Sequence, residues 1–233
     1  MIEIETTIHT MEQGTKEWHD FKLGKISASN IEKLMVGVLG RGDDYLKVVN
    51  SDEDVSFSKG ALTYLDKLVG EKTGIVSSGG VQTESMLFGT AMEPKSRALY
   101  EEKNNCKVVE YGFIEWNGYN VGVSPDGMDL EALTYQEIKN YNTKKVEKIV
   151  EENKPPKAAY LQIMMGLLTT GYERGVLILT DFRPMVKYEY TEMWFDRDEE
   201  LLEVMYKRII KASEYIDAQV KLKEEENIGW LFE

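Results

Sequence analysis

Two acidic residues and a lysine lie close together in the sequence, on two apolar runs that are typical of strands. Asp126 belongs to the turn sequence Ser-Pro-Asp-Gly, and Glu137 and Lys139 follow it in Glu-Ile-Lys. Side chains alternate faces along a strand, so Glu137 and Lys139 point the same way and Ile138 points the opposite way. A β-hairpin would bring Asp126 beside this pair. Carboxylates that converge in this way can bind a hard divalent cation and activate water.

The same segment also has a purely structural interpretation. Asp-Gly turns are common in hairpins, and an acidic protein contains Glu-x-Lys sequences by chance. A turn with a surface ion pair explains these residues as well as a metal site does. The rest of the chain has to decide between the two.

The composition favours one compact α/β domain, which we expect to span residues 1–233. Apolar residues make up 42% of the chain, enough for a sizeable core. No apolar run approaches the length of a membrane span, and the N-terminal sequence does not resemble a secretory signal. The single Cys106 excludes an internal disulfide, a cysteine-based zinc site and an iron–sulfur cluster held by four cysteines. We therefore expect an intracellular protein without a membrane partner.

The net charge of −13 argues against a polyanionic partner, but the distribution of charge matters more than its sum. The acidic excess is largest within residues 196–203 and 224–226, whereas lysines enrich the N-terminal region. Bound cations would also neutralise the carboxylates of a metal site. The acidic composition therefore does not exclude nucleic acid.

Apolar periodicity and turn residues predict the secondary structure. The expected helices cover residues 13–25, 31–36, 59–72, 83–104, 143–152, 157–170 and 195–223. The expected strands cover 106–110, 112–116, the apolar runs around the Ser-Pro-Asp-Gly turn within 121–130, 133–139, 175–180 and 185–194. Glu93 precedes Pro94 inside one helix and could be a third acidic group near a metal. Gln162 is a polar side chain in the middle of an apolar helix. The structural alternatives are that Glu93 is a solvated helix residue and that Gln162 lies at the rim of its helix.

The segment before the second helix could bind phosphate. Ser27, Ser29 or Asn30 can cap that helix, and Lys22 lies nearby. Free backbone N–H groups, hydroxyls and a lysine together suit a phosphate group. An ordinary helix cap beside a solvated lysine is the simpler interpretation on local evidence.

An ordered set of short motifs resembles the lambda exonuclease / YqaJ-like viral recombinase family of the PD-(D/E)xK nuclease superfamily. The motifs are Gln13-Gly, Trp18-His, Lys22-Leu-Gly-Lys-Ile-Ser-Ala-Ser29, Gly89-x3-Glu93-Pro, Ser124-Pro-Asp126-Gly, Glu137-Ile-Lys139 and Tyr160-Leu-Gln162. The resemblance covers most of the chain, from about residue 12 to about residue 185.

The resemblance implies a restriction-endonuclease-like core with a central mixed β-sheet flanked by helices. It implies a Mg²⁺-dependent 5′-to-3′ exonuclease that degrades one strand of linear double-stranded DNA and leaves a 3′ overhang. Two ions are implied, with Mn²⁺ as a substitute. It also implies work beside a single-strand-annealing recombinase, a ring-shaped homotrimer, and a phage or prophage origin in the cytoplasm of a bacterial host.

The resemblance further implies roles for residues at the centre of the site. Asp126 and Glu137 match the metal-binding carboxylates, with the carbonyl of Ile138 as an extra ligand. Lys139 matches the catalytic lysine, which orients and helps deprotonate the attacking water or stabilises the transition state. Glu93 matches the upstream acidic residue that assists the metals. The neighbouring helix supplies Gln162, which matches a glutamine that supports the active site.

The N-terminal residues match the part of the family that holds the DNA end. Lys22 and Ser29 match positions that bind the 5′-phosphate, and Ser27 is a further candidate beside them. Lambda exonuclease has arginine at the position of Lys22, and lysine cannot form the same bidentate fork. Preference for a phosphorylated 5′ end is therefore a weaker expectation than nuclease activity. Arg41, in a predicted loop over residues 37–58, is a candidate DNA contact.

Two alternatives stay open. The chain could be an endonuclease of the same fold, although the lone cysteine argues against the cluster-bearing Cas4-like type. It could also be a non-enzymatic DNA-associated binding protein with a decayed site. The presence of Asp126, Glu137 and Lys139 argues against decay.

Overall fold

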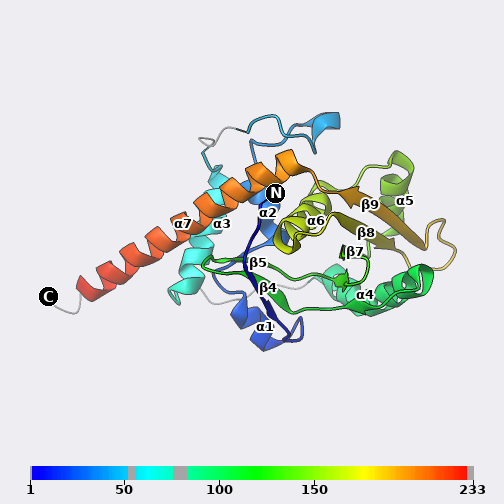
Figure 1. Cartoon of the computed structure of the whole chain (residues 1–233), viewed down its shortest axis with the longest axis horizontal. Helices are drawn as coiled ribbons and strands as arrows, with labels where there is room; N and C mark the ends of the chain where they lie inside the picture. The colour runs from blue at the N-terminus through cyan, green and yellow to red at the C-terminus, as the bar shows by residue number, and fades with distance from the viewer. Residues whose placement is uncertain (1, 52–55, 76–82, 230–233) are drawn as a thin grey trace.

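Two β-sheets organise the chain in the computed structural model, which describes residues 2–51, 56–75 and 83–229 (Figure 1). The four-stranded sheet has the order β1-β4-β5-β2, with β1 at Thr6–His9, β2 at Ile26–Ser27, β4 at Phe113–Trp116 and β5 at Val121–Val123. The five-stranded sheet has the order β3-β6-β7-β8-β9, with β3 at Val108–Val109, β6 at Gly127–Asp129, β7 at Thr134–Lys139, β8 at Arg174–Thr180 and β9 at Tyr190–Asp196. Each sheet combines one parallel pair, β2–β5 or β7–β8, with antiparallel pairs. The predicted mixed α/β fold is confirmed, in the form of two sheets.

The chain crosses from one sheet to the other at Ser124-Pro125-Asp126. β5 ends at Val123 in the four-stranded sheet, and β6 begins at Gly127 in the five-stranded sheet. Pro125 has no backbone N–H and cannot continue a ladder through this point. The predicted turn at Ser124-Pro-Asp-Gly therefore joins strands of two different sheets, and Asp126 lies at the junction between the sheets.

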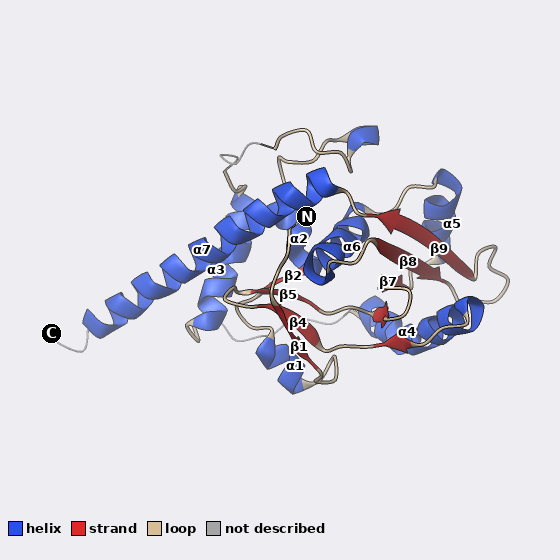
Figure 2. Ribbon diagram, viewed as in Figure 1, coloured by secondary structure: helices blue, strands red, loops and turns tan. Residues whose placement is uncertain are grey.

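One buried helix, α6 (Lys157–Thr170), packs against both sheets (Figure 2). It is apolar on nearly every face, as a helix enclosed by other elements must be. Gly166 allows the helix to approach β7, because a Cβ there would lie 2.4 Å from the ring of Tyr135. On the other sheet, the indole of Trp116 donates a 2.8 Å hydrogen bond to the Thr169 hydroxyl.

Helix α4 (Glu84–Asn104) covers the opposite face of the five-stranded sheet. Its Tyr100 packs with Ile138, Val176 and Ile178 in a small apolar cluster. The helix continues through Pro94, as the predicted helix over residues 83–104 does. The sheet therefore has α6 on one face and α4 on the other.

The remaining helices frame this core. They are α1 (Lys16–Phe21), α2 (Ile31–Leu34), α3 (Lys59–Lys72), α5 (Thr143–Glu152) and α7 (Glu199–Gly229), with 3₁₀ turns η1 (Ala28–Asn30) and η2 (Gly42–Asp44). Helix α3 packs on the long α7, where the Tyr215 hydroxyl donates to Asp66 over 2.7 Å. Within the described part, none of the helices has the length and apolarity that crossing a bilayer requires.

Differences from the predicted elements concentrate near the N-terminus. The predicted helix over residues 13–25 is reduced to α1, whose Trp18 and Phe21 are half-buried. Strands β1 and β2 were not predicted, because each is short and depends on partners in residues 113–123. Residues 52–55 of the predicted loop over residues 37–58 lie outside the described residues.

Candidate active site

The β6–β7 hairpin places Asp126 beside the Glu-Ile-Lys sequence. Gly127 pairs with Gln136, so Asp126 comes opposite Glu137. The backbone N–H of Ile138 donates a 2.7 Å hydrogen bond to Oδ2 of Asp126. The prediction that a hairpin brings Asp126 alongside Glu137 and Lys139 is confirmed.

Glu137 and Lys139 form a buried ion pair on one face of β7. Glu137 is 2% exposed, and the ammonium of Lys139 donates to its Oε1. Burial is the main reason that the pKa of Glu137 is raised to about 8. The Lys139 charge only partly opposes this shift, and the nearby Asp126 charge adds to it. Burial alone would lower the pKa of Lys139, but the carboxylates of Glu137 and Asp126 raise it overall.

Glu93 adds a third carboxylate from helix α4. Burial and, to a lesser extent, the charge of Asp126 raise its pKa to about 7, against the opposing charges of Lys139 and Arg97. Three carboxylates thus act on one another with too little positive charge between them. Perturbed acids of this kind mark sites that bind cations or move protons.

The side chains are not arranged as a finished metal cage. Among the described residues, no three His, Cys, Asp or Glu side chains converge closely enough to enclose a metal ion. The contact between Lys139 and Glu137 uses an oxygen that a cation would need. A cation at this position would compete with the Lys139 ammonium for the Glu137 carboxylate.

Gln162 lies on α6, the helix that covers the Glu137 face of β7. It is half-buried and precedes Gly166 by four residues, so both share one face of the helix. Gly166 contacts Tyr135, whose side chain points to the same face of β7 as Glu137. The helix thus positions Gln162 above the strand that carries the ion pair.

Lys22 approaches the carboxylates from the N-terminal segment. It follows α1 directly, and its Nζ lies 3.7 Å from the centroid of the Trp18 ring. Burial lowers the pKa of Lys22 to about 8, although the charges of Asp126 and Glu137 act to raise it. The structure therefore brings Lys22 into electrostatic reach of the site.

Ser27 and Ser29 form a small polar cluster next to α6. Their hydroxyl oxygens lie 3.1 Å apart, and the amide of Asn30 donates to both over 3.4 Å. The prediction that one of these side chains caps the second helix is wrong, since the chain forms the 3₁₀ turn η1 there and α2 has only four residues. The hydroxyls remain beside α6, which η1 contacts.

The contacts of the loop that carries Arg41 do not bring this residue to the carboxylates of the site. Its side chain is exposed at the start of η2. The loop reaches the core through Tyr45, whose hydroxyl donates to the carbonyl of Pro155 over 2.5 Å.

Three residues that hold the site together had no assigned role in the sequence. The Gln13 amide donates to the carbonyl of Pro125 over 2.8 Å, and the Trp18 indole donates to the Ser124 hydroxyl over 3.1 Å. Arg97 donates to the carbonyl of Asp126 over 2.9 Å from α4. Arg97 lies four residues after Glu93 on α4, and this helical spacing is the signal in the sequence that could have placed it beside the site.

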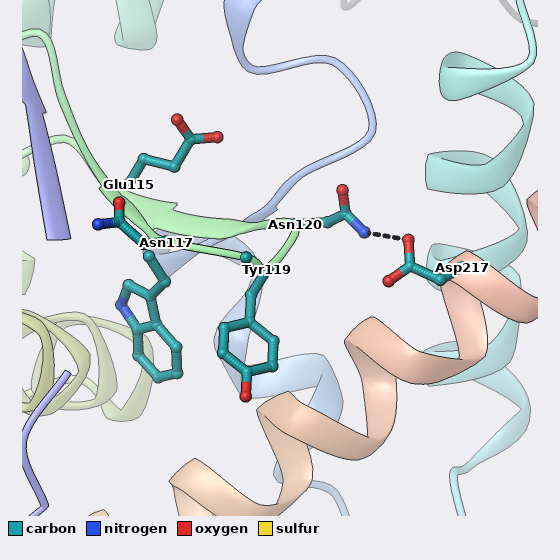
Figure 3. Close-up of a pocket in the computed structure, with 7 residues that line it drawn as sticks. Glu115, Asn117, Tyr119, Asn120 and Asp217 are labelled. Atoms are coloured by element: carbon teal, nitrogen blue, oxygen red, sulfur yellow. Dashed lines mark hydrogen bonds between the residues drawn. The ribbon is translucent and has the colours of Figure 1, made fainter. Parts of the chain in front are cut away.

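A second pocket lies between the β4–β5 turn and α7 (Figure 3). Its volume is about 440 Å³, and its labelled residues are Glu115, Asn117, Tyr119, Asn120 and Asp217. The Asn120 amide donates to Asp217 over 2.7 Å and joins the turn to the helix. This contact explains the pocket as a packing feature between two elements.

Comparison with known proteins gives a family and a fold. The model of the YqaJ-like viral recombinase domain matches residues 17–173. The crystal structure of LHK-Exo, an alkaline exonuclease from Laribacter hongkongensis, has a TM-score of 0.77 at 21% identity and covers 93% of this chain and 100% of its own. Its complex with dAMP gives 0.76 at 21% identity and the same coverage.

A more distant structure has the same fold. A phage related exonuclease from Haemophilus somnus 129PT has a TM-score of 0.59 at 11% identity, and the match covers 85% of this chain and 96% of that one. Among curated proteins, no sequence matches this chain.

Proposed function

The chain belongs to the YqaJ-like viral recombinase domain family, and from this premise we propose that it is a metal-dependent 5′-to-3′ exonuclease. It would degrade one strand of linear double-stranded DNA and leave a 3′ overhang. The observation that carries the proposal is the meeting of Asp126, Glu137 and Lys139 at the junction of the two sheets, with Glu93 in electrostatic contact. Each of these residue types has a part in phosphodiester hydrolysis.

The carboxylates suit a hard divalent cation. Asp126, Glu137 and Glu93, with the carbonyl of Ile138, would hold Mg²⁺, or Mn²⁺ in its place, because oxygen ligands are those that Mg²⁺ prefers. The raised pKa values of Glu93 and Glu137 support this fit, since burial and nearby carboxylates disfavour the charged forms that a bound cation would stabilise. When bound, a pair of ions would lower the pKa of a water molecule and neutralise charge on the phosphate.

Lys139 and Gln162 would act on the water and the phosphate. With a cation held by the Glu137 carboxylate, the Lys139 ammonium would be free to donate to the attacking water or to a phosphate oxygen. Gln162 would hold the water or phosphate from the α6 side. Because Glu137 and Lys139 are buried, electrostatic interactions with them are stronger than they would be in bulk water.

The DNA end would bind at the N-terminal side of the carboxylates. We assign the 5′-phosphate to Lys22, with the hydroxyls of Ser29 and Ser27 as hydrogen-bond partners. The proximity of Lys22 to Asp126 supports this assignment. Arg41, which is exposed at the start of η2, would contact DNA farther along the backbone.

We extend the proposal to the assembly in which the enzyme works. It would form a ring-shaped homotrimer around the DNA and work beside a single-strand-annealing recombinase, as the family resemblance implies. Light scattering tests the ring separately, since a monomer at working concentration would remove the ring and leave the chemistry in place.

Three DNA substrates incubated in parallel test the activity. Purified protein with Mg²⁺ should degrade linear duplex with a 5′-phosphate, degrade the 5′-hydroxyl form more slowly, and leave a covalently closed circle intact. The product should retain one full-length strand. Cutting of the circle would instead identify an endonuclease, and inactivity on all three substrates would contradict the proposal.

A further inference from the structure

A groove of about 830 Å³ opens beside Lys139, on the side away from the N-terminal segment. Its volume is in the range of ligand-binding pockets. It is bounded by α4, by the end of β7 and by the loop after β8. The residues that matter here are Phe88, Glu93, Lys139, Tyr141, Lys145 and Arg183.

Arg183 is held in a defined position at the wall of this groove. Its guanidinium donates to Oδ1 of Asp181 over 2.8 Å and to the carbonyl of Tyr141 over 3.1 Å. Asp181 is itself buried and accepts a 2.5 Å hydrogen bond from the Thr143 hydroxyl. The side chain of Arg183 remains 42% exposed, so its other donors are available to a ligand.

Aromatic rings accompany the cations of the groove. The Arg183 guanidinium lies 5.3 Å from the centroid of the Phe88 ring, and Nζ of Lys145 lies 3.4 Å from that of Tyr141. Phe88 is 39% exposed although it is a large apolar side chain. Cations that track a backbone and planar groups on which bases stack are the two features of single-strand nucleic-acid sites.

The N-terminal segment and the groove approach the carboxylates at different residues. Lys22 acts on Asp126 and Glu137, whereas the groove ends at Glu93 and Lys139. A strand whose 5′-phosphate lies at Lys22 and whose scissile phosphate lies at Asp126 would continue into the groove.

We propose that this groove is a subsite for the cut strand on the 3′ side of the scissile phosphate, where Arg183 binds a backbone phosphate and Phe88 contacts a base. This inference rests on the proposed nuclease function for its direction along the strand. The binding itself requires only single-stranded DNA.

The chain supplies a matched control for Arg183. Arg174 lies at the other end of β8, pairs with Asp196 over 2.9 Å and has its guanidinium 5.0 Å from the centroid of the Trp194 ring. Like Arg183, it lies beside one carboxylate and one aromatic ring, but it is remote along the strand from Leu179, the residue that pairs with Lys139. Arg183→Gln and Arg174→Gln each remove one arginine charge, and only Arg183 also contacts a buried carboxylate and a backbone carbonyl.

The test measures binding without turnover. A short 5′-phosphorylated single-stranded oligodeoxynucleotide with a 3′ fluorescein is titrated in Ca²⁺ buffer, and the recovered probe is checked for cleavage. Arg183→Gln should weaken binding about tenfold, because a charge-assisted phosphate contact is lost. It should also reduce the slope of log K against log salt by about 0.7, the value for one phosphate contact on a single strand.

Two further variants separate a ligand contact from a structural effect. Arg183→Lys should retain the salt slope of the unmodified protein, since it keeps the charge. Phe88→Ala should weaken binding at least about fivefold without changing the slope, as loss of a stacking contact does. Equal affinities and slopes for Arg183→Gln and Arg174→Gln would overturn the subsite. Failure of the unmodified protein to digest linear duplex would overturn only the proposed function.

Discussion

The amide of Gln13 donates a 2.8 Å hydrogen bond to the carbonyl of Pro125, the residue immediately before Asp126. The same amide donates to the carbonyl of Tyr111 over 2.9 Å. A side chain from the N-terminal segment thus fixes the backbone where the chain crosses between the sheets. The crossing sets the direction in which the Asp126 carboxylate points.

Loss of this contact should reduce catalysis more than substrate binding. We expect Gln13→Leu to lower kcat about tenfold and to raise the Mg²⁺ concentration needed for half-maximal activity, because residues that orient a metal ligand typically contribute tenfold to a hundredfold. Digestion rates of linear duplex over a Mg²⁺ series measure both effects. Gln219→Leu on α7 is the matched control and should leave both unchanged. An unaltered Mg²⁺ requirement in Gln13→Leu would show that Gln13 does not position Asp126.

The metal-free protein should become less stable as pH rises from about 5 to about 8. The folded-state pKa values of Glu93, about 7, and Glu137, about 8, exceed the usual value of 4.5. The folded state therefore binds more protons than the unfolded state within this window, and the free energy of unfolding falls with pH. Thermal melting in EDTA across the window measures the effect, and Glu137→Gln should reduce it. Mg²⁺ should raise Tm more at pH 8 than at pH 6. A Tm that rises over this window in EDTA would contradict the raised pKa values.

Preference for a 5′-phosphate should weaken above pH 8. The pKa of Lys22 is lowered to about 8, so its charge and its attraction for phosphate decrease as pH rises past that value. The measurement is the ratio of digestion rates on 5′-phosphorylated and 5′-hydroxyl duplex at pH 7 and pH 9. Lys22→Arg stays charged throughout, so its ratio should not vary with pH. The same pH dependence in Lys22→Arg would remove Lys22 from the phosphate site.

Local patterns were sufficient to predict the centre of the site. Strand alternation separates Ile138 from Glu137 and Lys139, and a hairpin between sequence neighbours brings Asp126 beside them. Helical spacing predicted α4 and α6, and hence the elements that carry Glu93 and Gln162. These predictions depend on interactions between residues close in the sequence.

Long-range contacts could not be predicted in the same way. Gln13 and Pro125 are separated by 112 positions, and their contact depends on how the two sheets meet. The sequence Ser-Pro-Asp-Gly predicts a turn, and only the pairing of β5 and β6 with different partners shows that this turn joins two sheets. The predicted helix cap near Ser29 was wrong because hydrogen bonds within the polar cluster compete with capping.

The central claim is that Asp126 is a metal ligand of a nuclease, and Asp126→Asn tests it most directly. The asparagine can still accept the hydrogen bond from Ile138, so the hairpin should remain folded. Asp129→Asn is the control, since Asp129 ends the strand that follows Asp126, is 3% exposed and accepts backbone hydrogen bonds in the adjoining turn. With Mg²⁺ and 5′-phosphorylated linear duplex, we expect Asp126→Asn to lose at least about a hundredfold in rate at little change in Tm, and Asp129→Asn to keep its activity. Digestion by Asp126→Asn at the rate of the unmodified protein would contradict the account.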